Sequence, residues 1–271
     1  MAFNVRKLTQ CDYLTSVWSG GTTTQLAIFP PEAKYADRDF LWRVSSATVD
    51  LEESDFTALP DYDRLIATLR GEIVLTHNGG APLTLHPFEV HAFSGGDATH
   101  SVGRCTDFNL MLRRGRASGT MEALHLAGSA QTSPAKGRGS AVSGAEEWCR
   151  PLAAEDSPAC HSERSAAESK NPFSPASTVG TSIACPLPGE TLLLYCAAGS
   201  CTVGAAIGRP PEAEGFPVCH SERSAAEPKN PSFPLPLHAG ETLLCTDTIP
   251  LTLTGTAELM LCRIKVTSDP L

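Results

Sequence analysis

Short runs of alternating or wholly apolar residues, separated by Gly, Pro, Asn and Asp, follow one another through residues 1–115. Alternation with a period of two is typical of a half-buried strand, and no long segment with the 3.6-residue period of a helix competes with these runs. Many short strands at regular spacing predict an all-β fold, either a sandwich or a barrel. The runs are residues 22–29, 40–49, 64–71, 72–78, 81–86, 90–93 and 107–114.

A smaller version of this pattern returns toward the C-terminus. The stretch GETLLLYC at residues 189–196 is echoed by GETLLCTD at residues 240–247. Each begins with a glycine, as a turn does, and continues as an apolar strand. The sequence therefore predicts a second β region.

Two segments between the β runs differ in composition. Residues 128–182 and 208–236 are dominated by Ala, Ser, Pro, Gly and Glu, and bury too little apolar surface to offset the entropy of ordering. They contain a near-duplicate, CHSERSAAESKNPFSP from Cys160 and CHSERSAAEPKNPSFP from Cys219. The adjacent Cys and His of each copy lack the spacer typical of a zinc site. We interpret both segments as in-frame inserts, which surface loops tolerate at little entropic cost.

Charge and hydropathy exclude several partners. The chain has 21 basic and 30 acidic residues, with no basic stripe interleaved with aromatics, so nucleic acid is not expected to bind. No apolar window reaches the length of a membrane span, and the N-terminus has no apolar signal segment, so we expect a cytoplasmic protein without a membrane partner. Ten cysteines without a CxxC pair fit reduced thiols, and Cys196, Cys245 and Cys262 lie in apolar runs.

Five segments of the N-terminal part together resemble a known family. They are WSGGTTTQLAIFPP (18–31), DFLWRVSSATVD (39–50), DFTALPDYDRLIATLRGEIVLT (55–76), FSGGD (93–97) and DFNLMLRRG (107–115). In this order they resemble the HutD/Ves family of bacterial cupin-like proteins, closely over residues 6–115 and thinly beyond. The resemblance implies a bicupin, a two-lobed double-stranded β-helix or RmlC-like jelly roll. It also implies an association with histidine-utilisation genes and no established catalytic activity.

The resemblance and the composition together set the expected domain boundaries. Residues 1–127 form the first cupin-like lobe, and residues 128–182 form the first low-complexity insert. Residues 183–271 form the second, smaller lobe, which the insert at 208–236 interrupts.

The histidines bear on the question of a metal. Cupins that bind a metal ion use a His-x-His pair with further ligands that converge on the ion. This chain has His77, His86, His91 and His100 in its N-terminal part, and none of them forms such a pair. We predict no metal and no cofactor in the barrel, with His86 and His91 at the surface or the rim.

Two of the expected strands have a polar face. Alternation along residues 40–49 places Arg43 and Ser45 on the side opposite the aromatic and apolar residues, and along residues 107–114 it does the same for Asp107 and Asn109. A further arginine, Arg64, begins another strand. Two such faces in one small barrel predict a polar interior.

Charged groups inside a barrel need partners, because an unpaired buried charge costs several kcal/mol. Asp107 could pair with Arg43 or Arg64 as a structural solution. Alternatively, two arginines facing one aspartate leave positive charge over, and a guanidinium fork matches a carboxylate through two parallel hydrogen bonds. The expected ligand-binding residues are Arg43, Arg64, Ser45, Thr22, Asn109, Trp18 and Asp107.

We therefore predict a metal-free protein that binds a small carboxylate. The family resemblance makes an acylated glutamate, such as formylglutamate, the candidate ligand, and implies a role in sensing or regulating histidine utilisation. The alternative is a metal-free hydrolase or isomerase that uses His77 or His91 as a base. No GxSxG elbow and no clear nucleophile–base pair occur, so no catalytic residue is assigned. A homodimer is left open.

Overall fold

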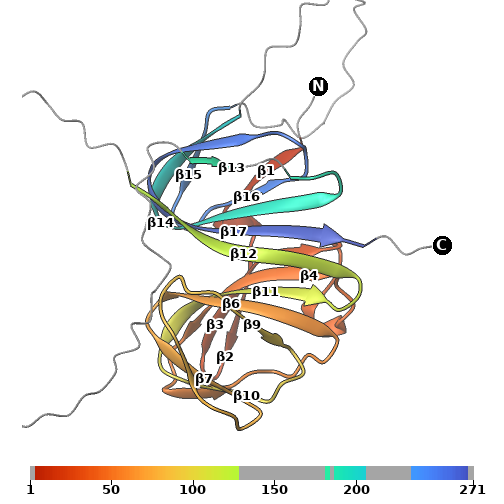
Figure 1. Cartoon of the computed structure of the whole chain (residues 1–271), viewed down its shortest axis with the longest axis vertical. Helices are drawn as coiled ribbons and strands as arrows, with labels where there is room; N and C mark the ends of the chain where they lie inside the picture. The colour runs from red at the N-terminus through yellow and green to blue at the C-terminus, as the bar shows by residue number, and fades with distance from the viewer. Residues whose placement is uncertain (1–3, 128–180, 184–185, 206–232, 268–271) are drawn as a thin grey trace, which may run out of the picture. The chain divides into compact units, whose positions relative to one another are not determined.

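The computed structural model describes residues 4–127, 181–183, 186–205 and 233–267 (Figure 1). Within these ranges the regular structure is β-strand with two short 3₁₀ helices, so the predicted all-β class is confirmed. The 3₁₀ helices are η1 (Gln10–Asp12) and η2 (Tyr35–Asp37). The strands are β1 (Val5–Leu8), β2 (Leu14–Trp18), β3 (Gly21–Phe29), β4 (Trp42–Val49), β5 (Glu53–Asp55), β6 (Tyr62–Arg70), β7 (Ile73–His77), β8 (Leu83–Leu85), β9 (His91–Ser94), β10 (Thr99–Val102), β11 (Cys105–Arg113), β12 (Ala117–Leu126), β13 (Thr181–Ile183), β14 (Glu190–Ala205), β15 (Leu235–His238), β16 (Thr242–Cys245) and β17 (Leu251–Val266).

The described strands form three antiparallel sheets. The first has the order β2-β3-β4-β11-β6-β9 and the second the order β5-β10-β7-β8. The third has the order β1-β16-β14-β17-β12, with β13 paired to β17 and β15 paired to β14. Residues 5–8 and 117–126, which the sequence places in the first lobe, thus pair with C-terminal strands. The division into two lobes stays a prediction.

The alternation expected of β4 and β11 is present. Trp42 and Val44 on β4, and Phe108 and Leu110 on β11, belong to one buried apolar cluster that also contains Met260 of the third sheet. The residues between them face the other side of the first sheet and line a cavity. Period two therefore separates an apolar face, which packs on the third sheet, from a polar one.

A second apolar cluster fills the space beside the third sheet. It contains residues of all seven strands of that sheet, with Cys196 and Cys245 among them. These two thiols and that of Cys262 are buried and free of disulfides, as the sequence predicts. Burial raises the pKa of Cys196 to about 11, which keeps this thiol protonated and unreactive near neutral pH.

The two GETLL segments begin with the same turn. Gly189 and Gly240 both have a positive φ, of 81° and 85°. The carboxylate of Glu190 accepts a hydrogen bond from the amide of Leu187 at 2.9 Å, and that of Glu241 accepts one from the amide of His238 at 2.8 Å. The predicted Gly-led turns are therefore confirmed as equivalent structures.

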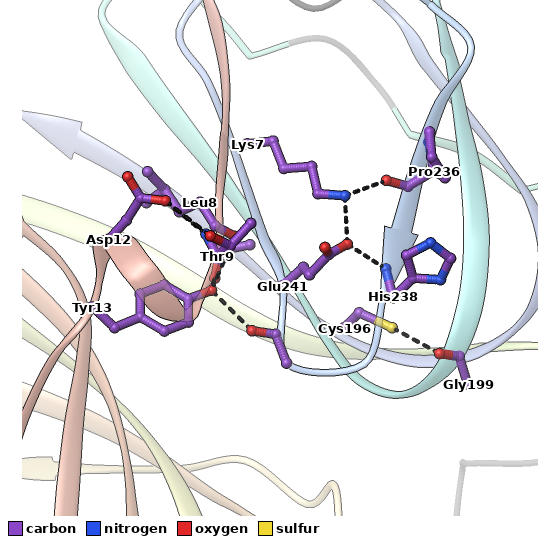
Figure 2. Close-up of polar contacts among 12 residues, drawn as sticks. Lys7, Leu8, Thr9, Asp12, Tyr13, Cys196, Gly199, Pro236, His238 and Glu241 are labelled. Carbon is purple, nitrogen blue, oxygen red and sulfur yellow. Dashed lines mark hydrogen bonds and ion pairs between the residues drawn. The ribbon is translucent and has the colours of Figure 1, made fainter.

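The second turn is joined to the N-terminal strand. Figure 2 shows Lys7 of β1 reaching Glu241, at 2.6 Å, and donating to the carbonyl oxygen of Pro236, at 2.9 Å. The hydroxyl of Tyr13 lies 2.8 Å from that of Thr242. These contacts anchor the first residues of the chain to strands that follow more than 200 residues later.

One prediction concerns residues that the structure does not describe. Both inserts, including Cys160 and Cys219, lie almost wholly outside the described ranges.

Among the described residues, neither 3₁₀ helix has the length and apolar character needed to span a bilayer.

Candidate functional site

A cavity of about 320 Å³ lies over the polar face of the first sheet. Its walls come from β2, β3, β4, β6 and β11, together with η2 and the segment 54–57. Six of the seven predicted ligand-binding residues line it: Trp18, Arg43, Ser45, Arg64, Asp107 and Asn109.

Strand register explains how these side chains meet. Met111 on β11 pairs with Arg43 of β4 on one side and with Arg64 of β6 on the other. The two arginines therefore flank β11 in the same row of the sheet. Asn109 and Asp107 follow at successive inward positions of β11, so the polar groups form a compact patch rather than scattered positions.

Arg43 is held in place by neutral partners. It is 5% exposed, its Nε donates to Gln25 Oε1 at 2.9 Å, and its Nη1 donates to Ser45 Oγ at 3.0 Å. Its Cζ lies 4.3 Å from the centroid of the Tyr35 ring, where a cation–π contact stabilises the charge. Burial lowers the pKa of the guanidinium to about 10, so it remains charged near neutral pH. Within the described part of the chain, no carboxylate pairs with it.

Arg64 has fewer polar contacts than Arg43. It is 6% exposed, and its buried Nε has no hydrogen-bond partner within the described ranges. Its Cζ lies 4.9 Å from the centroid of the Phe56 ring and 5.0 Å from that of the Phe93 ring. Burial lowers the pKa of this guanidinium too. A charged donor surrounded by aromatic rings and facing a cavity is suited to receive an anion.

Asp107 does not form the ion pair that was one of the two sequence hypotheses. Its Oδ1 accepts a hydrogen bond from the amide of Ala47 at 3.1 Å, and among the described residues no basic side chain pairs with it. Burial raises the pKa of this carboxyl to about 6, although the Ala47 amide, Arg64 and Arg43 oppose the rise. A single carboxylate, partly protonated near neutral pH, does not neutralise two guanidinium groups.

The first hairpin, β2 and β3, contributes Trp18 and Thr23 to the cavity wall. The Trp18 ring packs against Gly20, where an added Cβ would fall 2.0 Å from Cζ3. Thr22, the seventh predicted residue, does not line the cavity, and its neighbour Thr23 does. Thr23 pairs with Ala47, whose side chain also lines the cavity, whereas Thr22 pairs with Thr48.

A pair of histidines lies beside the aromatic residues that contact Arg64. His77 Nε2 is 2.9 Å from His91 Nε2, and His77 Nδ1 is 2.8 Å from Thr99 Oγ1. The His77 ring lies 4.8 Å from that of Phe93 and the His91 ring 5.8 Å, between centroids. Neither histidine lines the cavity itself.

His86 and His91, both expected at the surface or the rim, differ in exposure. His86 is exposed and pairs with Glu72 at 2.6 Å, whereas His91 is half-buried against His77. Burial, and then the neighbouring His77, lowers the pKa of His91. Among the residues that the structure describes, no group of three or more His, Cys, Asp or Glu side chains is placed to hold a metal ion.

Several residues in or beside the cavity were not predicted from the sequence. Gln25 orients Arg43, and Tyr35, Phe56 and Phe93 supply the aromatic rings beneath the guanidinium groups. Arg38 lies close to the same site, with its Cζ 3.8 Å from the Tyr35 centroid. Alternation carries no signal for Tyr35 and Phe56, because both lie outside the strands.

The described strands thus build an all-β fold of antiparallel sheets, with Arg43 and Arg64 on the wall of a cavity over one sheet face. A sequence model of the HutD family matches residues 10–157, more than half of the 271 residues. The chain therefore belongs to the HutD family. No curated protein matches it.

Several solved structures resemble this chain in fold. PA5104 from Pseudomonas aeruginosa PAO1, a conserved protein of unknown function, is 18% identical, with a TM-score of 0.58 over 98% of this chain and 100% of that chain. HutD from Pseudomonas fluorescens SBW25, described in a formate condition, is 15% identical, with a TM-score of 0.58 over 97% and 100%. The pirin YhhW from Escherichia coli, in complex with nickel(II), is 6% identical, with a TM-score of 0.51 over 97% and 100%. At these identities the likeness concerns the fold alone.

Proposed function

We propose that the cavity binds a small carboxylate. The observation that carries this proposal is the state of Arg64, which lines the cavity and whose buried Nε has no hydrogen-bond acceptor among the described residues. A buried donor without an acceptor is costly, and a charged one more so. A ligand carboxylate would supply the missing acceptor.

The remaining groups favour a small, singly charged ligand group. Arg43 keeps Nη2 free of described partners while Gln25 and Ser45 fix its other nitrogens, so its plane is already oriented. Asp107 would repel a multiply charged anion more strongly than a carboxylate. Asp55, also on the cavity wall, is exposed and lies 2.9 Å from His100 Nδ1, so it does not neutralise the arginines.

Formate and formylglutamate are the natural first ligands. The P. fluorescens HutD structure is described in a formate condition, and formate is the smallest carboxylate. Formylglutamate would place a carboxylate on the arginines and leave its amide for Asn109, whose buried Oδ1 has no partner among the described residues. We further propose that a cytoplasmic protein with this site senses or regulates histidine utilisation, in keeping with the family to which it belongs.

Isothermal titration and thermal shift test the proposal. Formate and formylglutamate should bind saturably and raise the melting temperature, because both bind only the folded state. Arg64→Gln should abolish the shift, whereas Arg104→Gln, which removes an exposed arginine paired with Glu52, should not. Equal shifts in both variants would contradict a cavity site.

One observation favours a catalytic alternative. The raised pKa of Asp107, about 6, would let this carboxyl act as a general acid or base near neutral pH. A hydrolase or isomerase would then release product steadily from formylglutamate, and Asp107→Asn would stop the release while leaving binding intact. Saturable binding without turnover supports the sensor.

A further inference from the structure

A second cavity, of about 340 Å³, lies on the opposite face of the first sheet. Trp42 on its wall immediately precedes Arg43 on β4, so their side chains leave the strand on opposite faces. Its other walls come from β3 on one side and from β1, β14 and β16 of the third sheet on the other. The volume lies near the lower end of the range of about 300 to 1,000 Å³ typical of small-molecule sites.

The wall of this cavity is mainly apolar. Leu8, Leu26 and Phe29 lie on it, and Phe29 is 37% exposed. Its ring stacks on that of Trp42 with 5.8 Å between centroids and 7° between planes. Such a wall suits an aromatic or aliphatic body.

The charged residues of the cavity are already paired with each other. Arg6 Nη2 lies 3.4 Å from Asp12 Oδ1, and both side chains are partly exposed. The cavity therefore presents no spare buried charge, in contrast to the arginine-lined cavity across the sheet. This difference argues for a neutral ligand.

One buried polar group of the wall has no partner. Trp42 is 3% exposed, and its indole Nε1–H has no hydrogen-bond acceptor among the described residues. An indole nitrogen is a donor only, and a buried Trp ordinarily finds an acceptor. An acceptor oxygen on a bound molecule would satisfy this donor.

We infer that this cavity is a second small-molecule site, for a neutral, mainly apolar molecule whose carbonyl or hydroxyl oxygen accepts a hydrogen bond from Trp42. This inference does not rest on carboxylate binding in the first cavity. Gln25 lines the second cavity, and the same residue accepts the hydrogen bond from Arg43. A molecule in the second cavity would therefore contact Gln25, the residue that orients Arg43 in the first cavity.

Acetophenone and ethylbenzene form a matched pair of probes, because they share a ring and a two-carbon chain and only acetophenone has an acceptor oxygen. Indole N–H resonances of the full ¹⁵N-labelled chain provide the readout, with the Trp42 signal assigned by its loss in Trp42→Phe. Acetophenone should shift the Trp42 signal saturably and bind more tightly than ethylbenzene. Trp42→Phe should weaken acetophenone about five-fold, the loss of a hydrogen bond worth about 1 kcal/mol, and leave ethylbenzene unchanged.

Two further variants locate the binding. Thr246→Phe adds bulk at an exposed residue of the cavity wall and should abolish binding of both probes without disturbing the core. Arg64→Gln, across the sheet, should leave both probes unaffected. The inference is overturned if acetophenone fails to shift the Trp42 signal, if Thr246→Phe binds it as well as the unchanged protein, or if ethylbenzene is equally sensitive to Trp42→Phe.

Discussion

Arg43 Nε donates a hydrogen bond to Gln25 Oε1 at 2.9 Å, and this contact joins two residues of neighbouring strands by their side chains. Ser45 fixes a second nitrogen of the same guanidinium at 3.0 Å. The third nitrogen has no described partner, and Arg64 supplies a second guanidinium on the same cavity. The carboxylate hypothesis therefore depends on planar geometry as well as on charge.

Arg43→Lys tests this dependence. An ammonium keeps the positive charge but cannot reproduce the planar fork or the contacts with Gln25 and Ser45 together. Formate affinity should fall by on the order of 2 to 5 kcal/mol, the loss expected for a buried charge-assisted contact. Titration calorimetry measures the loss, and the melting temperature without ligand shows whether the variant is folded. Unchanged affinity in a stable variant would exclude the fork.

The first hairpin provides a test of how the cavity wall is built. Gly21 has φ of +147°, and a Cβ there would fall 1.9 Å from the carbonyl oxygen of Thr48. Gly21→Ala should therefore cost at least about 3 kcal/mol, because a backbone atom cannot move aside as a flexible side chain does. Gly79→Ala is the control. Gly79 also has a positive φ, +67°, but has nothing within 4 Å, so only about 1 to 2 kcal/mol of strain is expected.

Urea unfolding of both variants measures the difference. A cost for Gly21→Ala no larger than that for Gly79→Ala would show that β3 and β4 separate at this point. The hairpin would then be a poor support for Trp18.

Sequence reasoning identified the polar face of the barrel because alternation is local. Arg43 and Ser45, and likewise Asp107 and Asn109, are two residues apart, and period two places each pair on one face whatever the rest of the chain does. The same rule failed to distinguish Thr22 from Thr23. Three successive threonines carry no periodic signal, and a one-residue change of register exchanges the faces.

The rest of the site depends on contacts distant in sequence. Tyr35 reaches Arg43 from a 3₁₀ turn, and Phe56 reaches Arg64 from a loop, so neither shares a strand with the guanidinium it contacts. The pairing of β1 with β16, some 240 residues apart, is likewise invisible to a local pattern. The hypothesis of an ion pair between Asp107 and an arginine assumed that opposite charges on neighbouring strands pair with each other. In the structure the Asp107 carboxylate instead accepts a hydrogen bond from the Ala47 amide.

The His77–His91 contact predicts a pH dependence of stability. Burial and His77 lower the pKa of His91 below its unfolded value of 6.5, so the unfolded chain binds the proton more readily. The contribution to the free energy of unfolding is therefore complete above about pH 6.5 and is lost as the pH falls toward the folded pKa. His91→Gln should remove this part of the slope, and His86→Gln, at an exposed position, should not. Urea unfolding between about pH 5 and about pH 8 measures the slopes, and identical slopes in all three proteins would contradict the prediction.

Asp107 predicts how carboxylate binding responds to pH. Because burial raises the pKa of this carboxyl to about 6, it is ionised at about pH 8, where it repels an anionic ligand, and is neutral at about pH 5. The groups that face it are Arg43 and Arg64, which stay charged, and the Ala47 amide. Formate remains ionised over this range, so its affinity should rise as the pH falls through about 6 and then level off.

The same raised pKa has the opposite effect on stability to that of His91. A carboxyl whose folded pKa exceeds its unfolded value of 3.8 stabilises the fold at low pH, and this contribution is lost as the pH rises through about 6.

A variant without this ionisable carboxyl tests the effect on binding. Because an asparagine side chain does not ionise, Asp107→Asn should bind formate at about pH 8 as tightly as the unchanged protein does at about pH 5, with little pH dependence between. Calorimetric titration at several pH values decides the matter, and an affinity that falls with falling pH in the unchanged protein would refute this role of Asp107.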